Sequence, residues 1–322
     1  MNRVLLLQLD GKLPNIALMR VAAHHRGLGD EVLFRKVGNA TALHPDLFDA
    51  PDLVYASTIF ERTRPLAEHL LTVYPAAKIG GTGINLTARL EDLGIYTWKQ
   101  DYSIYPTFQP SIGFSQRGCR LRCPFCVVPW KEGKVSEEQS IGQIWRGDPH
   151  PRHIILLDND FFGQPQWARR IDELRDGGFR VNFSQGINAR MLTDETAAAL
   201  ASVDYYNGGF QRRQLYTAWD NRKDEARLFR GLQALVDNGV RPVHIMVYIL
   251  IGYWPGETIE DWEYRRRRLR EFGSVPYPMP YVRTKEAVGF QRWVAGAYDK
   301  RIPLADWIAA DYRPEKLKEV AA

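Results

Sequence analysis

The stretch Gly118-Cys119-Arg120-Leu121-Arg122-Cys123-Pro124-Phe125-Cys126-Val127-Val128-Pro129 contains every cysteine of this 322-residue chain. The three thiols form a CxxxCxxC pattern, and an odd, tightly clustered set does not build a disulfide framework. Three thiolates can instead ligate three irons of a [4Fe–4S] cluster and leave the fourth iron open. Structural zinc, which takes four closed ligands, is the alternative. The sequence has no fourth cysteine and no histidine between His69 and His150, but a more distant histidine can complete such a site in a fold.

Strand-like and helical segments alternate between residues 112 and 300, a region that contains this stretch. The helical segments carry apolar residues at helical spacing, and glycines stand where helices should end. This pattern predicts a partial (β/α)6 barrel over residues 112–300, followed by a C-terminal tail at 301–322. The six strands expected are Ile112–Gln116, His153–Leu157, Arg180–Ser184, Tyr205–Gly209, Val243–Ile251 and Pro278–Val282.

A shorter alternation precedes the barrel and predicts a separate α/β domain over residues 1–100. Its expected helices are Asn15–Leu28 and Leu66–Val73, between strands that imply a parallel sheet of the flavodoxin or Rossmann kind. The strands are expected at Val4–Leu9, Glu31–Phe34, Leu53–Ser57 and Lys78–Ile79. A polar, proline-containing stretch over 101–111 is typical of a linker between the two domains.

The cysteine motif at the mouth of a (β/α)6 barrel, with aromatic Phe125 before the last cysteine, resembles the radical S-adenosylmethionine (SAM) superfamily. This resemblance implies a [4Fe–4S] cluster held by Cys119, Cys123 and Cys126, with SAM bound to the open iron. It also implies that one electron from the cluster cleaves SAM to methionine and a 5′-deoxyadenosyl radical. An external donor of the flavodoxin or ferredoxin type would supply that electron.

The resemblance also suggests which positions contact SAM. Residues Asp158-Asn159-Asp160 follow the second strand, where relatives accept a hydrogen bond from the methionine amine. Arg190 follows the third strand and resembles a SAM-contacting arginine, and Gln211 stands where relatives contact the ribose. The backbone around Ile251, before the Gly252-Tyr253-Trp254-Pro255-Gly256-Glu257-Thr258 turn, would face adenine. For Asp158 and Asp160, capping of the next helix is the structural alternative.

The N-terminal domain resembles the cobalamin-binding domain found fused to many radical SAM enzymes. Ser57, Thr58, Gly80 and Gly81 fall where that domain holds the nucleotide tail. The Asp-x-His-x-x-Gly cobalt-ligand motif is absent, since the first strand is followed by residues 10–15, Asp-Gly-Lys-Leu-Pro-Asn. Two readings therefore stay open: a cobalamin-dependent methyltransferase, or a radical enzyme whose N-terminal domain only shapes the substrate cleft.

Residues 127–129, Val-Val-Pro, also resemble the methylthiotransferase branch of the superfamily. That branch holds a second cluster with three further cysteines in its N-terminal domain, and this chain has none there. Methylthio transfer by that route is therefore not expected.

Composition is that of a globular protein, with 45% hydrophobic and 25% charged residues. The 43 basic residues against 38 acidic ones permit an anionic partner without arguing for one. No apolar stretch is long enough to span a bilayer, so we expect a cytoplasmic protein without a membrane partner. The substrate class stays open among RNA, peptide and small molecule. A non-catalytic metal-binding protein is the alternative of a different class.

Overall fold

The computed structural model describes residues 1–43 and 50–316, which form two compact units. Unit 1 comprises Met1–Ile112 together with Cys126–Gly133, and unit 2 comprises Gly113–Phe125 together with Lys134–Ala322. The boundary in the chain therefore falls next to the predicted start of the barrel.

Unit 1 is built on a four-stranded parallel sheet in the order β2-β1-β3-β4. Its strands are β1 (Arg3–Gln8), β2 (Glu31–Lys36), β3 (Leu53–Ser57) and β4 (Lys78–Gly80). Its helices are α1 (Ile16–Gly27), α2 (Arg64–Val73) and the short α3 (Val128–Lys131). Flavodoxin-like sheets begin with the same strand order.

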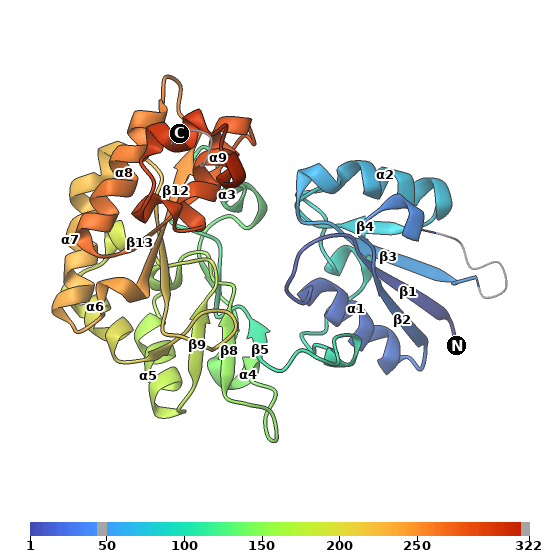
Figure 1. Ribbon diagram of the computed structural model, residues 1–322. Helices are drawn as coiled ribbons and strands as arrows, with labels where there is room; N and C mark the ends of the chain where they lie inside the picture. The colour runs from blue at the N-terminus through green and yellow to red at the C-terminus, as the bar shows by residue number, and fades with distance from the viewer. Residues whose placement is uncertain (44–49, 317–322) are drawn as a thin grey trace. The chain divides into compact units, whose positions relative to one another are not determined.

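Helices α1 and α2 cover opposite faces of this sheet (Figure 1). Successive side chains of a strand point to opposite faces. Val4 and Leu6 of β1 accordingly join the core beneath α1, whereas Leu5 and Leu7 join the core beneath α2. The almost unbroken apolar run of β1 thus reflects burial on both sides.

The segment expected as a linker is instead folded into unit 1. Tyr102–Ile104 form a 3-10 turn (η4), and Ile104 and Tyr105 are buried in the core beneath α1. The Tyr105 hydroxyl accepts a hydrogen bond from the Asn15 N–H (3.0 Å) and donates one to Oε1 of Gln8 (2.8 Å). The domain therefore extends to Ile112 rather than residue 100, because the stretch contains apolar side chains that gain by leaving water.

Unit 2 contains two parallel sheets, in the orders β10-β9-β8-β5 and β11-β12-β13, and a two-stranded antiparallel ladder of β6 and β7. Its strands are β5 (Ser111–Gly113, whose first two residues belong to unit 1), β6 (Gln116–Arg117), β7 (Ser136–Glu137), β8 (His153–Leu156), β9 (Arg180–Phe183), β10 (Asp204–Tyr205), β11 (Leu215–Trp219), β12 (Ile245–Ile251) and β13 (Val275–Pro280). Its α-helices are α4 (Ile141–Ile144), α5 (Trp167–Asp176), α6 (Asp194–Ala201), α7 (Glu225–Asp237), α8 (Ile259–Phe272), α9 (Lys285–Ala295) and α10 (Leu304–Ala309).

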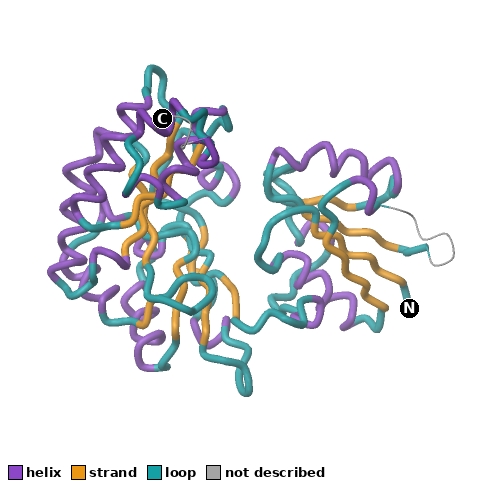
Figure 2. The backbone as a smooth tube through the Cα atoms, viewed as in Figure 1, coloured by secondary structure: helices purple, strands orange, loops and turns teal. Residues whose placement is uncertain are grey.

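Helices of unit 2 pack along one side of its strands (Figure 2). Strand β12 shows this arrangement clearly, because Ile245, Val247, Ile249 and Ile251 are fully buried against the helices while the residues between them are only partly buried. Unit 2 thus combines parallel strands with helices packed along them. No ladder joins β10 to β11 among the described residues, so the complete (β/α)6 barrel stays a prediction.

The predicted fourth strand, Tyr205–Gly209, is shorter than expected, and a strand was missed. β10 ends at Tyr205, the chain leaves the sheet over residues 207–212, and β11 then forms at Leu215–Trp219. The Asn207 N–H donates to the carbonyl of Arg212 (3.0 Å), which closes this excursion. Two glycines in succession weaken strand pairing at that point.

The expected C-terminal tail, 301–322, is partly folded. Trp307 of α10 is fully buried, and its indole N–H donates to the carbonyl of Gly289 (3.0 Å). Its ring stacks on Tyr298, with centroids 4.9 Å apart. The folded part of unit 2 therefore extends past residue 300; residues 317–322 lie outside the described ranges.

Candidate functional site

The cysteines lie in a loop that follows β5, and residues 118–126 are named the cysteine loop here. The β6–β7 ladder, in which Gln116 pairs with Glu137, fixes the start of this loop. The Gln116 side-chain amide donates to the carbonyls of Arg117 (2.5 Å) and Gly118 (2.6 Å). Gly118 has φ +77°, a left-handed conformation that glycine adopts without strain. Together these contacts turn the chain away from the sheet just before Cys119.

All three cysteines are half-buried and none forms a disulfide. The Leu121 N–H points at Sγ of Cys119 (3.4 Å), a contact that favours the thiolate. In the described ranges no three His, Cys, Asp or Glu side chains gather around a single point that could hold one metal ion. An iron–sulfur cluster offers each thiolate a different iron, so its ligands do not need to meet at one point.

Asp160 is tied to the cysteine loop through Arg120, the residue after Cys119. Both oxygens of Asp160 accept from the Arg120 guanidinium (2.8 and 2.9 Å), and Oδ2 also accepts the Arg120 main-chain N–H (3.0 Å). These bonds raise the pKa of Arg120, with a further contribution from Cys119. The buried Asp160 carboxylate is thus already paired, and its first role is to hold the loop against the end of β8.

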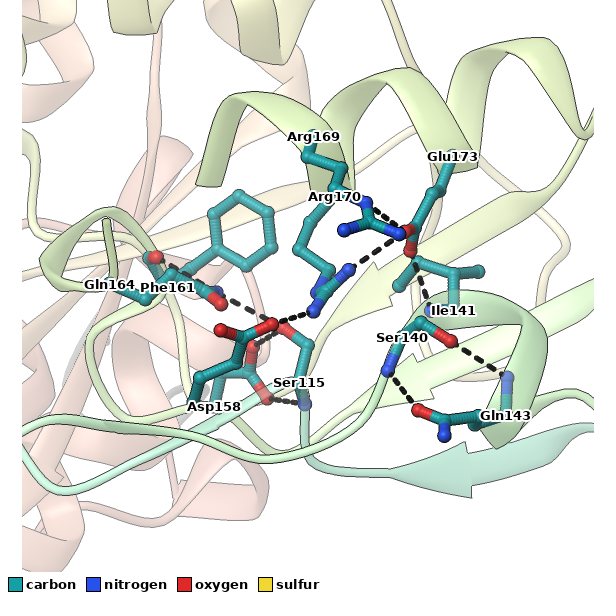
Figure 3. Close-up of polar contacts among 11 residues, drawn as sticks. Ser115, Ser140, Ile141, Gln143, Asp158, Phe161, Gln164, Arg169, Arg170 and Glu173 are labelled. Carbon is teal, nitrogen blue, oxygen red and sulfur yellow. Dashed lines mark hydrogen bonds and ion pairs between the residues drawn. The ribbon is translucent and has the colours of Figure 1, made fainter. Parts of the chain in front are cut away.

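Asp158 is directed into the interior of unit 2. It accepts hydrogen bonds from the Ser115 N–H (2.8 Å) and the Ser115 hydroxyl, and Gln164 donates to the same hydroxyl (3.1 Å). Figure 3 shows these side chains pointing toward one another, with Arg170 close by. Burial raises the pKa of Asp158 to about 7 despite the hydrogen bonds that favour its charge. Of the three residues predicted to receive the methionine amine, Asn159 is the least buried.

Arg190 lies in a 3-10 turn (η6, Ala189–Met191) after β9, on the same side as the cysteine loop. Its guanidinium binds Asp224 (2.6 Å) and Oδ1 of Asn188 (3.0 Å). Burial alone would lower the pKa of Arg190, but Asp224, Asp220 and the Cys123 thiolate raise it. Arg190 therefore remains a cation, with Cys123 among the groups that act on it; its predicted contact with SAM stays a prediction.

Helix α7 packs tightly on this turn. A Cβ placed on Gly231 of α7 would overlap the carbonyl oxygen of Ala189, the residue before Arg190. The absence of a side chain at Gly231 thus allows the helix to approach the turn that carries Arg190.

Gln211 does not lie where the sequence placed it. It belongs to the 207–212 excursion before β11, not to the carboxyl end of a strand. Phe210, with φ +56°, stacks on His153, the first residue of β8, with centroids 4.4 Å apart and planes at 9°. The excursion is therefore at the amino-terminal edge of the sheet. Gln211 was misplaced because the predicted strand ends before Gly208-Gly209, and the next strand, β11, begins only at Leu215.

Asp220 occupies the position that Gln211 was expected to hold. It follows Trp219, the last residue of β11, and its main-chain carbonyl accepts a hydrogen bond from the Trp254 indole N–H (2.6 Å). Burial raises the pKa of its carboxyl group, while Arg190 and Arg265 act in the opposite direction. Sequence reasoning missed Asp220 because it missed β11; the signal was the alternating Leu215–Trp219 segment.

Aromatic side chains that follow β12 and β13 pack around Phe125 of the cysteine loop. Together these residues are named the aromatic cluster: Phe125, Tyr253, Trp254 and Tyr281. Tyr253 contacts Phe125, Trp254 and Tyr281 edge to face, with ring centroids 5.3, 5.0 and 4.8 Å apart. Ile251, the last residue of β12, is buried, and its carbonyl accepts the Tyr281 N–H (2.9 Å). The cysteine loop is therefore in contact with the turn that follows Ile251, as well as with β8 through Asp160.

Ser57, Thr58 and Gly81, three of the four residues predicted to hold a cobalamin tail, are in close contact with other groups of unit 1. The Asp10 carboxylate accepts the main-chain N–H groups of Ile59 (2.7 Å) and Phe60 (2.9 Å) and the Thr58 hydroxyl (2.9 Å). A Cβ on Gly81 would overlap the Thr58 carbonyl oxygen, and Thr58 is fully buried. Ser57 accepts from the Asn15 side chain (2.8 Å). These residues do not fit a nucleotide tail, and no step is assigned to cobalamin.

Comparison with known proteins relates part of this chain to a known superfamily. Residues 114–268 match the family model described as the Radical SAM superfamily. A curated relative, tRNA-2-methylthio-N(6)-dimethylallyladenosine synthase of Roseiflexus sp. (strain RS-1), is 23% identical over 237 residues. That similarity covers 66% of this chain and 48% of the relative, so the chain spans about half the relative's length. Together the two findings support an enzyme.

A search of the helices in residues 1–43 and 50–316 found none with the length and apolar character of a membrane span.

Proposed function

We propose that the chain binds a [4Fe–4S] cluster through Cys119, Cys123 and Cys126 and uses it to cleave SAM reductively. The observation that carries this proposal is the position of the cysteine loop. It lies within the matched residues 114–268 and follows β5, and ligand sites of parallel α/β sheets lie beyond the carboxyl ends of the strands. When bound, the cluster supplies the electron that splits the sulfonium and leaves a 5′-deoxyadenosyl radical.

Two charged side chains, one after β9 and one after β11, give the carboxyl-terminal edge of the strands its binding chemistry. Arg190 remains protonated near Cys123 and can offset the negative charge of thiolates or bind a carboxylate. Asp220 follows β11 and presents a carboxylate that can accept hydrogen bonds from hydroxyl or ammonium groups. We therefore propose Asp220, in place of Gln211, as the polar contact for SAM at this strand.

The polar residues after β8 take different roles in this proposal. Asp160 positions the cysteine loop through Arg120, and Asp158 closes an interior network with Ser115. Asn159 stands between them and is the residue of the three that we propose for contact with SAM.

The aromatic cluster would restrict water at the same edge. Phe125 packs against Tyr253 directly before Cys126, so apolar rings cover one side of the cysteine loop. A site that holds a reactive radical must exclude competing reactions, and apolar walls serve that purpose.

For the substrate, we propose hydrogen abstraction by the radical rather than methylthio transfer of the relative's kind. All three cysteines of these 322 residues lie in the cysteine loop, which leaves no cysteine ligands for a second cluster. The identity of the substrate is not part of the proposal. An external flavodoxin- or ferredoxin-type protein is the proposed electron donor.

Anaerobic reconstitution of the full chain with iron and sulfide tests the proposal. We expect about four irons per chain, a broad absorption band of an iron–sulfur cluster, and 5′-deoxyadenosine with methionine after addition of SAM and dithionite. A colourless protein that binds one zinc ion with high affinity and never cleaves SAM would overturn it and favour the non-catalytic metal-binding alternative.

A further inference from the structure

Arg265 of α8 is buried at the carboxyl ends of two neighbouring strands, with a side-chain exposure of 1%. Its guanidinium donates to the carbonyl of Trp219 at the end of β11 (3.1 Å) and to the carbonyl of Leu250 near the end of β12 (2.9 Å). It also forms an ion pair with Glu257, whose side chain is 7% exposed. A single side chain thus joins α8 to both strands.

Glu257 links Arg265 to the turn between β12 and α8. Its second carboxylate oxygen accepts the main-chain N–H of Gly252 (2.7 Å), so the two ends of the turn 252–257 are held together. Tyr253 and Trp254 lie within this turn. Their rings contact Phe125, with centroids 5.3 and 6.5 Å from it.

The neighbouring arginines of α8 have no such connection to the turn. Arg266 pairs with Glu263 and Asp299 and lies over the Trp293 ring, 5.0 Å from its centroid. Arg270 binds the same Asp299. These contacts stabilise the outer side of unit 2. Arg265 therefore differs from Arg266 and Arg270 in the groups it contacts as well as in its burial.

We propose that Arg265 is a positioning residue for the cysteine loop, acting through Glu257 and the aromatic residues of the 252–257 turn on Phe125. The inference rests on the proposed function and deepens it, because it names the residue that holds the proposed cluster-binding loop in position. Arg265 is too deeply buried to meet substrate. Its planar guanidinium can reach two carbonyls and a carboxylate at once, which a lysine ammonium cannot do in the same geometry.

The alternative is that Arg265 contributes only to the stability of unit 2. The two roles make different predictions for the cysteines, because every thiol of the chain lies in the loop. The rate at which a thiol reagent modifies the unloaded, folded protein therefore reports on the loop and needs no cluster.

The experiment compares Arg265→Met with Arg266→Met as the matched control, together with Glu257→Gln and Arg265→Lys. Thiol modification of the apo full-length chain by Ellman's reagent is followed under native conditions, and urea unfolding of each variant is measured in parallel. We expect Arg265→Met and Glu257→Gln to react about tenfold faster than wild type, since a charged hydrogen bond that holds the turn is lost. Arg265→Lys should recover part of the wild-type rate, and Arg266→Met should match wild type.

Equal thiol rates in Arg265→Met, Glu257→Gln and Arg266→Met would overturn the inference. The inference would also be overturned if the thiol modification rate rose in every variant in proportion to its loss of global stability. If Arg265→Met fails to fold, the milder Glu257→Gln decides by the same comparison. A wild-type protein that never acquires a cluster would refute the proposed function while leaving the thiol comparison as a separate result on the loop.

Discussion

The indole N–H of Trp254 donates a hydrogen bond to the main-chain carbonyl of Asp220, 2.6 Å away. This bond joins the residue after β11 to the turn after β12, so Asp220 is held at the same edge as the aromatic cluster. A carboxylate in this position is expected to contact the ligand that binds there.

Replacement of Asp220 by Asn should weaken SAM binding about 10- to 100-fold, because a charge-assisted hydrogen bond is worth roughly 1.5–3 kcal/mol. Equilibrium dialysis of SAM with the cluster-loaded protein measures the effect. Gln211→Ala is the control and should bind SAM as wild type does, since Gln211 lies at the opposite edge of the sheet. The reverse result would restore Gln211 as the contact.

Replacement of Cys119, Cys123 or Cys126 by Ala, one at a time, should abolish both the cluster and SAM cleavage. In the proposed cluster each thiolate would bind its own iron, and the sequence contains no other cysteine to substitute for it. Iron content, absorption and 5′-deoxyadenosine formation are measured on the same samples, with circular dichroism as the folding control. Full cleavage activity in any single variant would refute the ligand assignment.

Asp158 should make the stability of the protein depend on pH. Its pKa is about 7 in the folded state and 3.8 as the ordinary value, so the folded state binds more protons between these two pH values. The free energy of unfolding therefore falls as the pH rises through this window, and the destabilisation is complete above pH 7. Asp158→Asn removes this contribution while keeping the shape of the side chain.

Urea unfolding at pH 5 and pH 8 tests this expectation. Relative to wild type, Asp158→Asn should gain roughly 2–3 kcal/mol between the two pH values, since one pKa unit corresponds to about 1.4 kcal/mol. The comparison cancels the contributions of other titrating groups. A constant difference between the two proteins would show that Asp158 is ionised throughout.

Gly81 and Gly80 should respond very differently to Ala. Gly81 has φ +104° and its backbone lies against Thr58, whereas a Cβ on Gly80 would meet no atom within 4 Å. We expect Gly81→Ala to destabilise unit 1 by about 2–4 kcal/mol and Gly80→Ala by less than about 1 kcal/mol. Thermal unfolding checks the stability, and incubation of the wild type with hydroxocobalamin should give no uptake. Stoichiometric uptake by the wild type would contradict the packing argument.

Most of the regular structure was predictable because its signal is local. The helix at Asn15–Leu28 matches α1 to within one residue at each end, and Asn15 caps it through the Leu18 N–H (3.1 Å). Strand β13 is less clear from the sequence, which predicted Pro278–Val282 where the structure has Val275–Pro280. Its three prolines lack donors, but among the described strands β13 pairs with β12 alone, and prolines are tolerated on such an edge strand.

The site was harder to predict because its residues meet only in the folded chain. The CxxxCxxC motif is a contiguous signal and gave the cofactor class that the superfamily match supports. The pairing of Asp160 with Arg120, by contrast, joins residues 40 positions apart and could not be read from the sequence, and the predicted contact of Asp160 with SAM stays a prediction. Four arginines follow one another at residues 265–268, and the hydrogen bonds of Arg265 to the ends of β11 and β12 distinguish it from its neighbours.

The tight approach of α7 to the turn that carries Arg190 has a consequence for mutational scanning. Gly231 bears no functional group and belongs to an outer helix, yet any side chain there must push apart α7 and Ala189. In a saturation library scored for activity, position 231 should tolerate almost nothing, and its profile would look like that of a cysteine ligand. The two kinds of position separate only when folded abundance is scored as well, since losses at Gly231 should follow abundance and losses at Cys123 should not.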